Sequence, residues 1–87
     1  MHERKMFEDF MKQIEAVARQ ENATRVTVVR AKIGALSHLT PEHFREHFLE
    51  ASRGRLAEGA RIEVETIPGI THPLARDLVL DSLDLES

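Results

Sequence analysis

The spacing of apolar side chains along this 87-residue chain changes between helical and strand-like periods. Apolar residues recur at three- and four-residue intervals over residues 3–22, which predicts an amphipathic helix. Asn22 is expected to end this helix, because asparagine tolerates the left-handed conformation that closes many helices. The predicted apolar stripe consists of Phe7, Phe10, Met11, Ile14, Val17 and Ala18.

A second helix is predicted after the segment Leu39-Thr40-Pro41-Glu42. Threonine is a good N-cap, and proline is favoured at the first helical position because its missing N–H would have no acceptor there. Leu39 and Phe44 occupy the two positions of a hydrophobic staple. The helix is expected to cover residues 41–53, with Gly54 as the stop. Its inward side chains are expected to be Phe44, Phe48 and Ala51.

Three strands are predicted over residues 24–36, 61–67 and 77–85, and two of them break the alternation of a regular strand. In the first, Val26 and Val28 share one parity, whereas Val29, Ala31 and Ile33 share the other. Either both faces of this strand are partly covered or a β-bulge near residues 27–29 shifts the register, and the bulge is favoured. The third strand changes parity at Asp81-Ser82.

The order helix, strand, helix, strand, strand predicts an α+β fold, with two helices packed on one face of a three-stranded mixed sheet. The length predicts a single domain over residues 1–87. A small sheet with open edge strands can pair with a second copy, so a homodimer is an alternative to a monomer.

Composition excludes several classes of function. The net charge of −3, the scattered lysines and arginines and the absence of tyrosine and tryptophan argue against nucleic-acid binding. Without cysteine there is no disulfide, thiolate zinc site or cysteine nucleophile. No run approaches the roughly 20 apolar residues of a membrane-spanning helix, and no signal-peptide core is present, so we expect no membrane partner and a cytoplasmic location.

The segment Met1-His2-Glu3 is the first candidate for metal chemistry. A free α-amine, the amide nitrogen of His2 and the His2 imidazole lie on adjacent links of the chain. They can enclose a small cation in fused chelate rings. Nitrogen ligands that tend to one plane suit Ni(II) or Cu(II) better than Zn(II) or Mg(II). Three residues alone are a weak signal, and on them alone we favour the interpretation that His2 has no special role.

His43 and His47 form a second candidate, because residues four apart are neighbours on one face of a helix. Two histidines at this spacing can bind Zn(II) or Ni(II), and Glu46 or Glu50 could add an oxygen ligand. No third strong ligand is near in the sequence, so a solvated face is the favoured interpretation.

No catalytic residues are predicted. His38 and His72 are expected to be exposed polar residues. The serines lack the surroundings of a nucleophile elbow, and no glycine-rich phosphate loop is present. The sequence therefore favours a protein that is not an enzyme.

Several segments, taken in register, make the chain resemble the HypA family of nickel metallochaperones, which serve the maturation of hydrogenase and urease. The resemblance covers nearly the whole chain apart from one loop. The segments that carry it are Met1-His2-Glu3, Arg25-Val26-Thr27-Val28-Val29, Lys32-Ile33-Gly34-Ala35-Leu36-Ser37, Thr40-Pro41-Glu42, Ala57-Glu58-Gly59-Ala60 and residues 77–86.

The resemblance implies a Ni(II) site near the N-terminus. His2 would be the key ligand, helped by the Met1 amine, by local backbone nitrogens and by Glu3. The protein would hold nickel there and pass it to a partner. The partners implied are a HypB-like GTPase, the precursor of the hydrogenase large subunit and, in some organisms, urease accessory proteins. The alternative is an adaptor in a maturation complex that delivers no metal, and a metal-dependent enzyme using His43 and His47 is least favoured.

One departure from the family is large. Members carry a zinc domain with two Cys-x-x-Cys pairs between the second and third strands. Here that place holds only a short loop near residues 69–76, and the chain has no cysteine. Structural zinc is therefore not expected, and the predicted metal ligands are Met1, His2 and Glu3.

Overall fold

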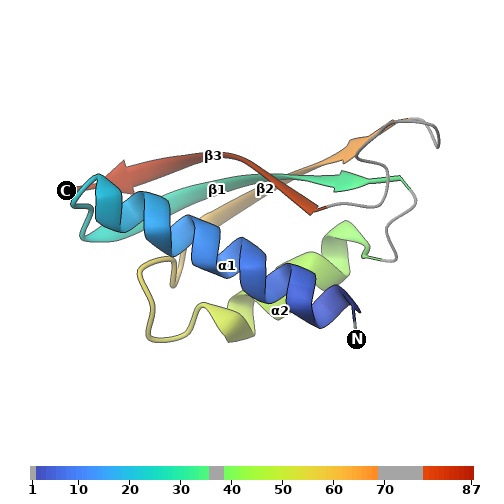
Figure 1. Ribbon diagram of the computed structural model, residues 1–87, viewed down its shortest axis with the longest axis horizontal. Coiled ribbons are helices and arrows are strands. Elements are labelled where there is room, and N and C mark those ends of the chain that lie inside the picture. The colour runs from blue at the N-terminus through green and yellow to red at the C-terminus, as the bar shows by residue number, and fades with distance from the viewer. Residues whose placement is uncertain (1, 36–38, 69–77) are drawn as a thin grey trace.

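The computed structural model describes residues 2–35, 39–68 and 78–87, with residues 2–4 described by their backbone alone. Two helices lie on the same face of a three-stranded sheet (Figure 1). The elements are α1 (His2–Gln20), β1 (Arg25–Gly34), α2 (Pro41–Ala51), β2 (Arg61–Ile67) and β3 (Leu78–Glu86). The predicted α+β architecture and order of elements are confirmed.

The strand β1 lies at the centre of the sheet, whose order is β2-β1-β3. It pairs with β2 in parallel and with β3 antiparallel, so the sheet is mixed as predicted. The core lies between the helices and the inner face of β1. Its buried apolar residues include Phe10, Met11, Ile14 and Ala18 of α1, Val26, Val29, Ala31 and Ile33 of β1, and Phe44 and Phe48 of α2.

Both predicted irregularities of the sheet are present. The pairing of β1 with β3 shifts between Val26 and Val28, which allows Val26 and Val29 to face the helices together. A second shift places Ser82 opposite Arg30 and Leu80 opposite Ala31, which leaves Asp81 as an extra residue of β3. Since side chains alternate along a strand, each bulge restores the apolar residues that follow it to the inner face.

The helix ends agree with the sequence in part. Asn22 has a φ of 55°, and α1 ends just before it. The Thr40 hydroxyl accepts a hydrogen bond from the His43 amide at 3.1 Å, as expected of an N-cap. The predicted end of α2 at residue 53 is two residues too far, because Ser52 is the C-cap and the chain leaves the helix before Gly54.

Two other details of the prediction are wrong, one in the core and one at the end of a strand. Val17 was expected in the apolar stripe of α1, but 38% of its surface is exposed because it lies at the edge of the stripe. The strand β3 covers Leu78–Glu86, so it ends one residue after the predicted end at residue 85. The first residue predicted for it, Asp77, lies outside the described residues, as does the predicted loop at 69–76.

The outer face of the sheet is covered by ion pairs instead of a second layer. Arg30, in the middle of β1, contacts Asp84 of β3 at 2.9 Å and Glu63 of β2 at 3.2 Å. Lys32 lies 3.9 Å from Asp81 on the same face. Charged side chains thus keep this face hydrated, which explains how a sheet covered by helices on one side remains stable in water.

We expect Asp84→Asn to lower the free energy of unfolding at neutral pH and to matter less below about pH 4. The hydrogen bond from Arg30 holds the pKa of Asp84 below its ordinary value. The stabilisation is therefore complete above the unfolded-state pKa and is lost as pH falls through the folded-state pKa. Urea unfolding at several pH values measures it. In an Arg30→Gln background the substitution should have little effect, and an equal effect in both backgrounds would contradict this prediction.

Candidate metal centre at the start of helix α1

The helix α1 begins at His2, so His2 and Glu3 lie in its first turn. The first four N–H groups of an α-helix have no acceptor within the helix. The amide nitrogen of His2 can therefore bind a metal ion without breaking a hydrogen bond of the helix. Met1 lies outside the described residues, as do the side chains of His2 and Glu3, so their ligand geometry remains a prediction.

The next turn of α1 is fixed to α2 by aromatic contacts. The ring of Phe7 lies 5.7 Å from that of Phe44, in an edge-on arrangement, and 5.8 Å from the imidazole of His47. Phe10 makes a second edge-on contact with Phe44 at 5.4 Å. These contacts hold the first turn of α1 beside α2, at the end of the helix that Figure 1 marks N.

A shallow depression adjoins this end of the molecule. It has a volume of about 340 Å³ and is lined by Phe7, Glu8, His47, Glu50 and Ala51. Carboxylates and an imidazole thus surround the anchored turn of α1. Among the side chains that the structure describes, however, no three or more His, Asp or Glu residues lie close enough together to hold a metal ion.

The predicted pair His43 and His47 does come together. Their ring centroids are 5.4 Å apart, and both residues are exposed on the outer side of α2. The predicted candidates His38 and His72 lie outside the described residues. The fold therefore brings two imidazoles together, and the backbone of His2 and Glu3 belongs to the neighbouring helix α1.

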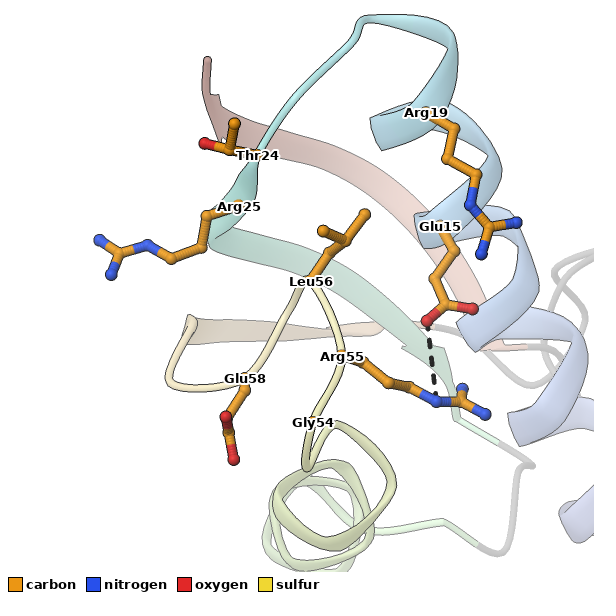
Figure 2. A pocket seen from close by; sticks show the side chains of 8 residues that line it. All are labelled: Glu15, Arg19, Thr24, Arg25, Gly54, Arg55, Leu56 and Glu58. Atoms are coloured by element: carbon orange, nitrogen blue, oxygen red, sulfur yellow. Dashed lines mark ion pairs between the residues drawn. The ribbon is translucent and has the colours of Figure 1, made fainter.

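A larger hollow lies away from both candidates, between the end of α1, the start of β1 and the loop after α2. It has a volume of about 690 Å³, and three arginines line it (Figure 2). Arg55 is paired with Glu15 at 3.7 Å, and Arg25 points away from the other two arginines. Because the positive charges do not converge, this hollow is not an anion site. The contact between Glu15 and Arg55 leaves no signal in helical spacing, because Arg55 lies in the loop after α2.

Comparison with known proteins gives the family. A family model described as hydrogenase/urease nickel incorporation metallochaperone HypA matches residues 1–72. The chain belongs to the HypA family. Curated relatives named hydrogenase maturation factor HypA are 41% identical in Rhodopseudomonas palustris (strain BisA53), 38% in Dechloromonas aromatica (strain RCB) and 36% in Methylocella silvestris, each over 69 residues.

Each of these matches covers 79% of this chain and 61% of the relative, so the chain spans about three fifths of the length of the HypA proteins it matches. The strand β3 lies beyond residue 72, where the family match ends. A metallochaperone carries a metal and is not named for a catalysed reaction, which fits the expectation of a protein that is not an enzyme. Within the described residues no helix is both long and apolar enough to cross a membrane.

Phe7→Ala should destabilise the protein by about 2 kcal/mol, less than the 3–5 kcal/mol typical of a fully buried phenylalanine. The ring is only partly buried, but it joins the first turns of α1 to α2. Urea unfolding measures the loss, and amide hydrogen exchange should speed up near the start of α1. Val17→Ala on the same helix is the control and should cost less than about 1 kcal/mol. Equal costs for both variants would show that Phe7 is not an anchor.

Proposed function

We propose that this HypA-family chain carries Ni(II) at Met1-His2-Glu3 and passes it to a partner that matures a nickel enzyme. The ligands proposed are the Met1 amine, the amide nitrogen and imidazole of His2, and the carboxylate of Glu3. The observation that supports this most directly is that α1 begins at His2, where backbone nitrogens have no acceptor within the helix. The family description as a nickel metallochaperone supports the choice of metal.

The electrostatics of this site favour nickel bound to a deprotonated amide and a carboxylate. A helix N-terminus carries a partial positive charge, which opposes a bare cation. The deprotonated His2 amide and the Glu3 carboxylate, with a neutral amine and a neutral imidazole, cancel the charge of Ni(II), so the complex as a whole is not repelled. The site therefore requires proton release, and nickel affinity should fall as pH falls.

Loading the site requires only a local change at the start of the chain. A chelate ring through the Met1 amine and the His2 amide needs a ψ of about 0° at Met1, because the four protein atoms of the ring must lie nearly in one plane. The ring through the His2 amide and imidazole closes by rotation of the His2 side chain. Such a change at a helix end would cost little, because helix ends fray readily. Protonation of the amide would favour release to a partner.

The proposed partners are a HypB-like GTPase, a hydrogenase large-subunit precursor and urease accessory proteins. They would dock near the start of α1, where the metal is exposed. Residues 1–87 would act as one nickel domain. Structural zinc would be absent from it, because these residues include no cysteine to supply the thiolate ligands of the family's zinc site. Copper would bind a planar nitrogen site more tightly than nickel, so selectivity would come from metal supply and from partners.

His2→Ala should abolish the ultraviolet–visible band of planar Ni(II) that untagged protein with a free Met1 amine develops on titration. The imidazole is the only side-chain nitrogen in the proposed ligand set, so its loss leaves only two backbone nitrogens and the Glu3 carboxylate. Acetylation of the Met1 amine should remove the band as well. His43→Gln is the matched control, because it removes a histidine and leaves the N-terminal ligands in place. Equal nickel affinity of the wild type and His2→Ala would favour the adaptor role.

Substitutions at position 3 test the carboxylate of Glu3 as the fourth ligand. Glu3→Ala removes the carboxylate and keeps the backbone amide, whereas Glu3→Asp keeps a carboxylate. We expect Glu3→Ala to shift the planar band and weaken nickel binding, and Glu3→Asp to retain more of the binding. Equal nickel affinity of the wild type and Glu3→Ala would show that Glu3 is not a ligand. Circular dichroism checks that both variants remain folded.

A further inference from the structure

The helix α2 presents two imidazoles side by side on its outer face. We propose that His43 and His47 clamp a single divalent transition-metal ion of the borderline class, such as Zn(II) or Ni(II), at a site separate from the N-terminal chelate. This inference goes beyond the proposed function, since it concerns a second site made of side chains only.

The distance between the rings fits one shared ion. Two imidazoles bound to the same ion through bonds of about 2 Å have ring centroids roughly 5 Å apart. The observed separation of His43 and His47 is 5.4 Å, with the ring planes inclined by 51°. Small rotations of the side chains therefore suffice for binding, and the backbone of α2 need not move.

Both histidines are held by the surrounding structure. His43 lies in the first turn of α2, and its amide donates to the Thr40 hydroxyl at 3.1 Å. The His47 ring packs against Phe7 of α1 at 5.8 Å. Between them along the sequence, Phe44 is fully buried and fixes the rotation of the helix. A pair built on a rigid helix loses little freedom when it binds an ion, which favours affinity.

The surroundings of the pair suit a cation with water ligands. His43 and His47 line a hollow of about 400 Å³ together with Glu46, Leu49, Glu50 and Arg53. The two carboxylates attract a cation, and the single arginine lies six residues beyond His47 along the helix. No third ligand lies close enough in the described part of the chain, so water would fill the remaining positions. Such an ion would exchange readily with its surroundings.

Zinc titration of protein with an acetylated N-terminus tests the pair, because acetylation removes the amine of the other site. Calorimetry should show one equivalent of Zn(II), and nuclear magnetic resonance should show shifts of the C–H signals of both imidazoles. His43→Gln and His47→Gln should each weaken binding at least tenfold, since even outer-shell partners of a metal typically change affinity by about 10- to 100-fold. Glutamine is chosen at position 47 to preserve a contact with Phe7.

The matched control keeps the number of histidines and changes their spacing. In the double variant His43→Gln/Arg45→His, two histidines lie two residues apart, where helical side chains do not face each other. This variant should bind Zn(II) as weakly as His43→Gln alone. Binding as tight as that of the parent protein, or unchanged affinity in both single variants, would overturn the proposal.

The two metal proposals fail in different ways. With a free N-terminus, His43→Gln should retain the planar nickel band that His2→Ala loses. Conversely, acetylated His2→Ala protein should retain the Zn(II) equivalent that His43→Gln loses. Loss of zinc binding in acetylated His2→Ala would assign the zinc to the N-terminus and would overturn the clamp on α2.

Discussion

The aromatic contact between α1 and α2 is the interaction on which the rest of the structure depends. All four phenylalanines of the chain take part in it, and Phe44 contacts the other three. The cluster closes the core beneath β1 and fixes the rotation of α2. Because Phe7 touches both Phe44 and His47, the same packing holds the N-terminal part of α1 beside the histidine pair.

The sheet complements this cluster by separating its two faces. The bulge between Val26 and Val28 turns the apolar residues of β1 toward the helices, and Arg30 is left on the outer face. There Arg30 joins Asp84 of β3 to Glu63 of β2 across the central strand. These exposed pairs add little stability each, but they define which side of the sheet faces water. The two helices lie on the other side.

The sequence predicted the elements, the favoured bulge in β1 and the place where β3 changes parity, because burial of one face leaves a record in the parity of apolar residues. It placed the end of α2 too late because Ser52, a polar residue, is buried and ends the helix before the glycine. It placed Val17 in the core because periodicity does not give the width of the buried stripe. The histidine pair followed from helical spacing, but its packing against Phe7 depends on a contact between distant segments.

The N-terminal ligands were only a weak signal until the family resemblance supported them, for a physical reason. A site in which backbone nitrogens supply half of the ligands has little side-chain signature, and it would form only when the His2 amide loses its proton. The histidine pair is the opposite case, since its ligands are already close on a rigid helix. Binding at the first site would be coupled to loss of an amide proton, and binding at the second would not. A chaperone must release its cargo, and a ligand set whose backbone nitrogen regains its proton on release suits that task better than a preformed clamp.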